Sequence, residues 1–231
     1  AYGEALDPWF SHSRISLLDR GFIFAIAHVR GGGDLGMQWY QYGKLKHKTN
    51  SVFDFIACSE FLLNNNYTSP NMLAINGGSA GGLLIGAALN AQPQLYQCAT
   101  LEAPFLDCLN TMLDESLPLT ITEFDEWGNP KHDDYYKLIK SYSPYENISS
   151  HDYPHILVLA NVNDTRVQFW EAVKWTAKMR AHKTDKNTLL LHMDDNSGHS
   201  GASGRYSTIK EIAFQYAFLL RRLSAMELKN E

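Results

Sequence analysis

Short apolar runs alternate along the chain with longer segments in which apolar residues recur at helical spacing. The expected strands cover residues 72–75, 98–101, 155–160 and 188–193, and the expected helices cover residues 52–62, 83–89, 168–182 and 209–223. Strands separated by helices favour an α/β fold with a parallel sheet. We expect Asn50 or Ser51 to cap the first helix. In the last helix, the residues expected to face inward are Ile209, Ile212, Tyr216, Leu219, Leu220 and Leu223.

The turn between the first expected strand and the helix that follows it carries a Gly-x-Ser-x-Gly pattern. Gly77-Gly78-Ser79-Ala80-Gly81 follows the apolar run 72–75 and precedes the helical pattern 83–89. A serine placed between a strand and a helix in this way is typical of a nucleophile elbow, in which the backbone of the serine is strained and the strand and helix lie close together. We therefore expect Ser79 to be a nucleophile and both flanking glycines of the pattern to be sterically required.

A serine hydroxyl is a poor nucleophile at neutral pH and needs a histidine base and an orienting acid. Asp164 follows the apolar run 155–160, and His199 lies in the glycine-containing loop after the run 188–193. Serine, acid and histidine in this order, each beyond the carboxyl end of a strand, is the arrangement of an α/β-hydrolase. The sequence therefore predicts a catalytic triad of Ser79, Asp164 and His199.

Several sequence blocks carry a more specific resemblance. They are Ser16–Gly21, Ala27–Gly33, Gly77–Gly82, Thr111–Asp114, Glu126–Pro130, Ser141–Tyr145 and Ser197–His199. Over essentially the whole chain these blocks resemble the catalytic domain of the oligopeptidase B branch of the prolyl oligopeptidase family of serine peptidases. The resemblance implies that residues 1–231 form an α/β-hydrolase catalytic domain, that residues 107–153 form an insertion over the active site, and that Ser79, Asp164 and His199 are the triad.

The same resemblance implies that the chain is only part of a longer protein. Members of this branch carry a β-propeller domain ahead of the hydrolase domain, and Ala1-Tyr2-Gly3 does not look like a natural amino terminus. The first strand and the tyrosine that the family uses in its oxyanion hole are expected upstream of Ala1, and Tyr2 matches a different aromatic position. The other oxyanion donor is expected to be the backbone N–H of Ala80, the residue after the nucleophile.

Acidic residues are concentrated in one segment of the predicted insertion. Residues 114–134 contain seven acids and one lysine, a local charge of −6, whereas the whole chain carries −5. Because loops at the carboxyl ends of strands overhang the active site of such a sheet, this segment is expected to attract cationic substrates, although most of its acids are better explained as solvated surface charges.

Three acids in the chain match positions that the family uses to bind basic substrates. By the resemblance, Glu123 and Asp125 receive the arginine or lysine on the amino side of the cleaved bond, and Asp125 stands where the family usually has glutamate. Asp7 matches an acid linked with the preceding basic residue of the substrate, while Trp9 replaces a second acid. We therefore expect cleavage of short peptides after Arg or Lys, with a weaker preference for a further basic residue just before that Arg or Lys.

Composition and the remaining motifs narrow the other possibilities. The 231 residues, 45% apolar and 19% charged, suffice for one soluble globular domain. No apolar run has membrane length, no signal peptide is recognisable, and the cysteines Cys58, Cys98 and Cys108 are expected to be free thiols, so we predict a cytoplasmic protein. Gly31-Gly32-Gly33 lacks the spacing of a phosphate-binding loop, and neither a cofactor, a metal, a nucleic acid nor a membrane partner is expected.

Two other functions remain open from the sequence. One is a prolyl endopeptidase-like esterase or thioesterase with the same triad. The other is a non-catalytic binding domain on a hydrolase fold, because a fold by itself does not determine a function.

Overall fold

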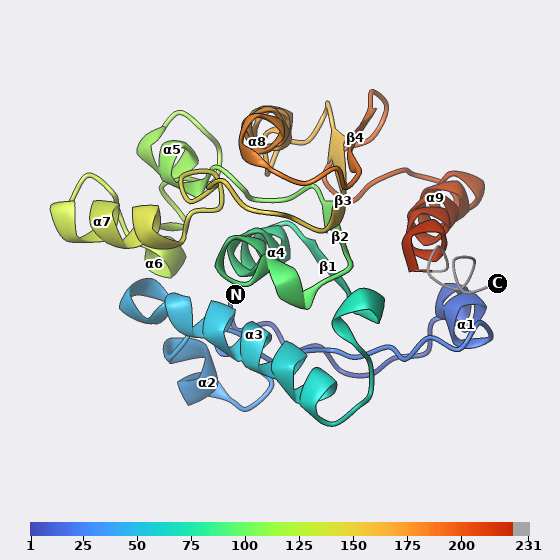
Figure 1. Cartoon of the computed structure of the whole chain (residues 1–231). Helices are drawn as coiled ribbons and strands as arrows, with labels where there is room; N and C mark the ends of the chain where they lie inside the picture. The colour runs from blue at the N-terminus through green and yellow to red at the C-terminus, as the bar shows by residue number, and fades with distance from the viewer. Residues whose placement is uncertain (224–231) are drawn as a thin grey trace.

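A parallel β-sheet forms the centre of the computed structural model, which describes residues 1–223 (Figure 1). Its strands are β1 (Ala74–Gly78), β2 (Cys98–Glu102), β3 (His155–Asn161) and β4 (Leu189–Asp194). They lie in the order β1-β2-β3-β4, and all neighbouring pairs are parallel. Helices cover both faces of the sheet, so the predicted α/β architecture is confirmed.

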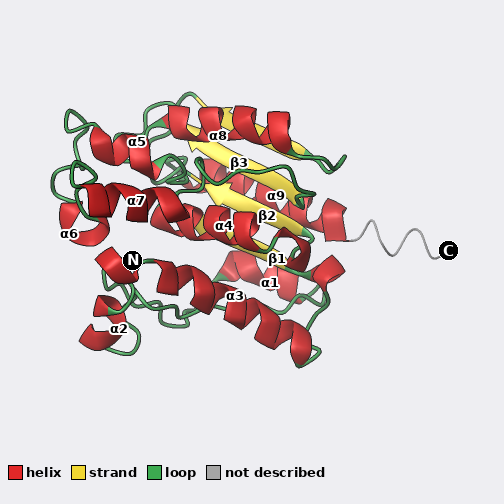
Figure 2. Ribbon diagram, turned by 60° about the vertical axis from the view of Figure 1, so that its left-hand side comes forward, coloured by secondary structure: helices red, strands yellow, loops and turns green. Residues whose placement is uncertain are grey.

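The helices vary from one turn to five turns in length. Their bounds are α1 (His12–Leu18), α2 (Met37–Gln41), α3 (Thr49–Asn64), α4 (Ala80–Ala91), α5 (Cys108–Leu113), α6 (Phe124–Trp127), α7 (Asp133–Tyr142), α8 (Phe169–His182) and α9 (Arg205–Leu223). Short 3-10 helices cover η1 (Leu45–His47), η2 (Pro70–Met72) and η3 (Pro93–Leu95). Helices α3, α4 and α8 lie on one side of the sheet and α1 and α9 on the other, as Figure 2 shows from a second direction.

The strands follow the predicted apolar runs, with one shift in β1. Six of the seven residues of β3 are buried, as expected for a strand that is covered on both faces. The first strand was expected at residues 72–75, but β1 begins at Ala74, and Pro70–Met72 forms the 3-10 helix η2. The prediction was wrong at this end because a proline without an N–H favours a turn before the ladder begins.

The hydrophobic core has one large cluster, a smaller one under the insertion and a third between the sheet and α9 that includes Cys98, Leu157 and Phe218. The large cluster joins the sheet to α4 and α8 and includes Ile85, Leu89, Leu101, Ile156 and Trp175. The smaller cluster joins α4 to the segment between β2 and β3 and contains Leu83, Phe105, Cys108, Leu109, Met112, Trp127, Ile139, Tyr142 and Val167. Because Leu83 of α4 belongs to this second cluster, the segment between β2 and β3 packs directly beside the helix that follows Ser79.

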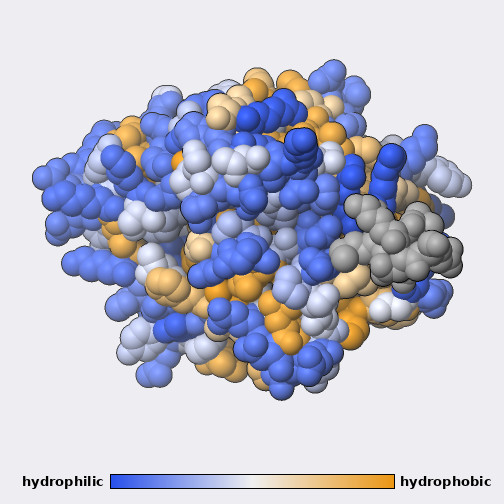
Figure 3. Space-filling view, in the orientation of Figure 1, coloured by the Kyte–Doolittle hydropathy of each residue, from blue (hydrophilic) through white to orange (hydrophobic). Residues whose placement is uncertain are grey.

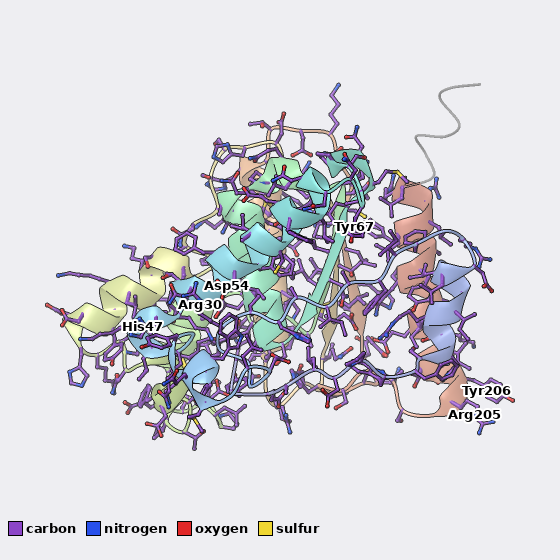
Figure 4. All side chains as sticks on the ribbon, turned by 90° about the horizontal axis from the view of Figure 1, so that it is seen from below. Arg30, His47, Asp54, Tyr67, Arg205 and Tyr206 are labelled. Carbon is purple, nitrogen blue, oxygen red and sulfur yellow. The ribbon has the colours of Figure 1, made fainter. Side chains whose placement is uncertain are left out.

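The beginning of α3 differs from the prediction. The helix begins at Thr49, and neither Asn50 nor Ser51 caps it. Instead, the hydroxyl of Ser51 donates a hydrogen bond of 2.6 Å to the carbonyl oxygen of Arg30. Arg30 also forms an ion pair of 2.6 Å with Asp54 on the same helix, and the two side chains lie side by side in Figure 4. Ser51 therefore joins α3 to the amino-terminal segment, a tertiary contact that the local sequence pattern does not reveal.

Some apolar side chains lie on the surface rather than in the core. The apolar run 22–29 forms no strand, and Ile23 is 64% exposed. On α3, Phe53 and Phe61 are exposed, and apolar residues gather over this helix in Figure 3. No helix of the described residues is both long and apolar enough to cross a membrane.

Helix α9 buries Leu223 as predicted, but its other buried residues differ from the predicted ones. Gln215, Phe218 and Leu223 are buried, whereas Ile209 is 47% exposed. Tyr206, in the first turn, points away from the rest of the molecule (Figure 4). The prediction was wrong at Ile209 because the helix packs across the sheet with a polar residue, Gln215, on its inner face. The predicted domain 1–231 also includes residues 224–231, which lie outside the described residues.

Candidate active site

Ser79 occupies a strained turn between β1 and α4. Its backbone has φ of 51° and ψ of −122°, a conformation that side-chain-bearing residues rarely adopt. Contacts from the neighbouring strand hold the turn in place. The N–H of Ser79 donates to the carbonyl oxygen of Glu102 at 2.9 Å, and the carbonyl oxygen of Ser79 accepts from the N–H of Phe105 at 3.0 Å. The predicted elbow is therefore present, with the serine at its tip.

The two glycines of the pattern have different importance. A Cβ at Gly77 would lie 2.5 Å from the carbonyl oxygen of Gly81 and 2.6 Å from Cγ1 of Ile85, which is closer than atoms can approach without movement. A Cβ at Gly81 would meet no atom within 4 Å. Close contact between strand and helix therefore explains Gly77, but the expected steric requirement for Gly81 is wrong.

His199 and Asp164 lie next to Ser79 although they are distant in the sequence. Asp164 follows β3 and His199 lies in the loop after β4, so the parallel sheet brings both to the same edge as the elbow. The Nε2 atom of His199 is 3.1 Å from the Ser79 hydroxyl oxygen, and its Nδ1 atom is 2.8 Å from Oδ2 of Asp164. An ionised carboxylate only accepts hydrogen bonds, so Nδ1 carries the proton and Nε2 is free to accept from the serine.

The surroundings of Asp164 keep this carboxyl group ionised. Asp164 is 5% exposed, and burial by itself would raise the pKa of its carboxyl group. The hydrogen bond from His199, together with those from the backbone N–H groups of Arg166 at 2.8 Å and Val167 at 3.0 Å, outweighs burial and holds the pKa of Asp164 below its usual range. One carboxylate oxygen thus anchors the carboxylate to its own loop while the other orients His199.

Ala80 is the first residue of α4, directly after the nucleophile. The first N–H groups of a helix have no acceptor within the helix, and they lie at its partially positive end. The Ala80 N–H therefore has the position and the polarity of an oxyanion donor. Ala80 and Ser79 also line the same cavity.

A cavity beside Ser79 extends over α4 toward the segment between β2 and β3. We call it the α4-side cavity. Its lining is formed by Tyr2, Ser79, Ala80, Phe105, Thr111, Met112, Leu117, Leu119, Thr120, Glu123, Arg166 and Val167. Half of these residues belong to the predicted insertion 107–153, which therefore borders the nucleophile.

Glu123 and Asp125 lie at different distances from this cavity. Glu123 is part of its wall, and Oε2 of Glu123 accepts hydrogen bonds from the Tyr2 hydroxyl at 3.1 Å and from Nε1 of Trp127 at 2.6 Å. Asp125 is exposed and does not line the cavity, and Asp7 is exposed on the segment before α1 and is likewise outside the lining. The structure therefore brings only Glu123 of the three predicted substrate-binding acids to the nucleophile.

Two of the other acids of the 114–134 segment are paired with lysines. Glu126 is buried in an ion pair with Lys48 at 2.9 Å, and Glu115 pairs with Lys131 at 2.6 Å on the surface. The local charge of −6 thus overstates the field near Ser79.

Two residues of the α4-side cavity were not found from the sequence. Tyr2 packs edge-on against Trp127, with ring centroids 5.8 Å apart. Burial of the Tyr2 hydroxyl and, to a smaller extent, the neighbouring Glu123 carboxylate raise the pKa of this hydroxyl. Arg166 adds a guanidinium to the lining. The only signal for Arg166 was its position two residues after Asp164. Tyr2 matched an aromatic position of the family, but nothing in the sequence joined it to Glu123, which lies 121 residues away.

No metal site can be assigned in the described part of the chain, where no three His, Cys, Asp or Glu side chains are grouped to hold an ion. The three cysteines are free, with Cys98 and Cys108 buried.

The parallel sheet, the elbow and the convergence of serine, histidine and aspartate together define an α/β-hydrolase domain. Residues 8–225 match the model of the prolyl oligopeptidase family, and the chain belongs to this family. It is 47% identical to Protease 2 of Moraxella lacunata over 96% of the chain and 32% of that protein, and 46% identical to the prolyl endopeptidase-like protein of Homo sapiens over 94% of the chain and 31% of that protein.

A solved structure gives the same result for the fold. Oligopeptidase B of Leishmania major is 48% identical, with a TM-score of 0.95 over 97% of this chain and 31% of that one. The chain therefore spans about a third of the length of the curated relatives that it matches.

Proposed function

We propose that this chain is the catalytic part of a serine peptidase that cleaves short peptides after Arg or Lys. The observation that carries the proposal is the hydrogen-bonded series Ser79–His199–Asp164, with 3.1 Å between the first pair and 2.8 Å between the second. Membership of the prolyl oligopeptidase family supports the reaction class.

In the proposed reaction, His199 accepts the proton of the Ser79 hydroxyl as its oxygen attacks the carbonyl carbon of the peptide bond. Asp164 holds the imidazole in the required tautomer and stabilises the imidazolium. The N–H of Ala80 donates to the oxyanion, and a second donor, expected from a tyrosine upstream of Ala1, completes the hole. His199 then protonates the leaving amine, and water activated by the same histidine hydrolyses the acyl-enzyme.

The preference for basic residues is supported by Glu123. Both of its known donors, Tyr2 and Trp127, bond to Oε2, so the described contacts leave Oε1 for a substrate cation. A guanidinium or ammonium group would form a charge-assisted hydrogen bond there. The guanidinium of Arg166 in the same lining repels a substrate cation. The preference for Arg or Lys therefore depends on direct contact between Glu123 and the substrate side chain, and not on the overall charge of residues 114–134.

The substrate proposal is tested with matched arginyl and neutral substrates. Ser79→Ala should abolish hydrolysis of an arginyl ester while the circular dichroism spectrum stays unchanged. Glu123→Gln should reduce hydrolysis of the arginyl ester more than that of a neutral ester. Asp125→Asn, measured alone and combined with Glu123→Gln, shows whether the predicted pair acts together. An equal decrease on both substrates in Glu123→Gln would refute the assignment of this carboxylate.

The sequence leaves a second candidate open, an esterase or thioesterase with the same triad. Rates on an arginyl amide and a thioester separate the two. A non-catalytic binding domain, the third possibility, predicts that an active-site serine probe does not react at all.

The remaining expectations concern the rest of the protein. We propose that a β-propeller domain and the first strand of the sheet belong to the parent chain, and that residues 107–153 act as the insertion over the active site, in agreement with the residues they contribute to the α4-side cavity. The free cysteines support a reducing, cytoplasmic location. Asp7 is proposed to contact a second basic residue of the substrate.

A further inference from the structure

A second cavity adjoins Ser79 on the opposite face of the sheet. We call it the α9-side cavity, because Thr208, Glu211 and Gln215 of α9 form one wall; its volume is about 300 Å³. The ends of β1, β2 and β3 and the loop that carries His199 form the remaining walls. Figure 1 shows α4 and α9 on opposite sides of the sheet, so the two cavities meet only at the nucleophile.

The position of His199 indicates which part of a substrate each cavity can receive. In the proposed reaction the imidazole protonates the leaving amine, so the portion of the substrate that departs first must lie beside His199. His199 lines the α9-side cavity but is absent from the lining of the α4-side cavity. The acyl portion therefore belongs with Glu123 on the α4 side, and the leaving portion belongs on the α9 side.

Two carboxylates give the α9-side cavity its charge. Oε1 of Glu102 accepts a hydrogen bond from Nδ2 of Asn76 at 2.7 Å, and Oε2 of Glu211 accepts one from the N–H of Ala202 at 3.1 Å. Each carboxylate thus uses one oxygen in the described contacts and has its second oxygen for a ligand. The lining, in the part of the chain that the structure describes, contains no lysine or arginine.

An amide side chain in the same wall points to a polar ligand. Gln215 is only 9% exposed and lines the cavity, yet its side chain forms no hydrogen bond within residues 1–223. Asn161, 6% exposed, donates from Nδ2 to the carbonyl oxygen of Gly198 at 2.8 Å, and its oxygen is left as a further acceptor. The amide atoms of Gln215 are not among the buried polar atoms without a partner, so they open into the cavity, where a ligand with N–H donors would bond to the amide oxygens.

We propose that the α9-side cavity is the leaving-group subsite and that it favours a lysine or arginine on the carboxyl side of the cleaved bond. This inference rests on the proposed function and names a second substrate position for the same site. Glu102 and Glu211 supply the charge, while Asn161 and Gln215 supply acceptors for the N–H groups of the bound residue.

Capture of the acyl-enzyme by added amines tests the subsite directly. The acyl-enzyme is formed from an arginyl ester, and lysinamide or norleucinamide competes with water. The two amines differ mainly in the side-chain charge. We expect lysinamide to capture the acyl group about tenfold better, as one charge-assisted hydrogen bond in a partly buried site allows. In Glu102→Gln with Glu211→Gln the ratio should fall toward one, whereas Glu60→Gln, an exposed change on α3, should keep it.

The ratio within one variant is informative even if Glu211→Gln loosens the loop around Ala202, because both amines then react with the same altered enzyme. A fluorophosphonate probe that labels Ser79 confirms that each variant retains its site. If the wild type neither reacts with the probe nor hydrolyses the ester, the proposed function fails and the subsite with it. Turnover with a ratio near one in the wild type, or a tenfold ratio that survives both substitutions, would overturn the subsite while the peptidase proposal stands.

Discussion

Replacing Asp164 with asparagine should reverse the hydrogen bonding of His199 without disturbing the fold. Oδ1 of Asp164 accepts from the backbone N–H groups of Arg166 and Val167, and these two donors require an oxygen. The asparagine oxygen must therefore take the Oδ1 position, so its NH₂ group faces Nδ1 of His199. Nδ1 then has to accept, the proton moves to Nε2, and His199 can no longer take the proton of Ser79.

The size of the loss follows from this change of tautomer. Serine hydrolases in which the orienting aspartate becomes asparagine lose about 10⁴-fold in turnover, which corresponds to a barrier increase of about 5.4 kcal/mol. Alanine at the same position makes an instructive comparison. Asp164→Ala leaves the two backbone N–H groups without their acceptor, which costs about 1–3 kcal/mol of stability. It imposes no tautomer on His199, however, so it should be less stable but more active than Asp164→Asn.

The assay combines the rate of arginyl ester hydrolysis, urea unfolding, and ¹⁵N chemical shifts of the His199 ring, which identify the protonated nitrogen. We expect Asp164→Asn to unfold close to the wild type and to show a proton on Nε2. A loss of less than tenfold in Asp164→Asn, or a proton that remains on Nδ1, would refute the reasoning. So would an Asp164→Ala variant that is less active than Asp164→Asn.

Two further predictions concern stability. Gly77→Ala places a Cβ 2.5 Å from the carbonyl oxygen of Gly81 and should lower the free energy of unfolding in urea by about 1–3 kcal/mol. Gly81→Ala has open space at its Cβ and should not lower it. Equal stabilities of the two variants would contradict the packing described for the elbow. Burial raises the pKa of Glu171 from 4.5 to about 7, so its folded form binds more protons than the unfolded chain between these values. Stability from this group is complete below pH 4.5 and is lost as pH rises to 7, by roughly 3 kcal/mol. Glu171→Gln should remove this part of the decrease between pH 5 and pH 8, and an unchanged pH dependence would contradict it.

The triad could be predicted from the sequence because its signals are local. Ser79, Asp164 and His199 each follow an apolar run, and a parallel sheet brings the carboxyl ends of its strands to one edge. Neither the distances nor the folding of the intervening residues had to be known.

The walls of the two cavities could not be predicted in this way. Tyr2 reaches Glu123 across 121 positions of sequence, and Gln215 lies on the inner face of α9, where the apolar pattern predicted Ile209 and Ile212. Asp125 lies two residues after Glu123 but on the exposed side of the short helix α6. In each case the tertiary packing of an insertion or a terminal helix, and not the local pattern, decides which side chain meets the substrate.

The most direct test of the account is the reaction of the chain with a fluorophosphonate probe, followed by peptide mass spectrometry. The triad geometry predicts one adduct, on Ser79, which is lost in Ser79→Ala and formed much more slowly in His199→Ala. No adduct in the folded protein, or equal labelling with and without the imidazole of His199, would contradict the claim that these side chains form an active nucleophile.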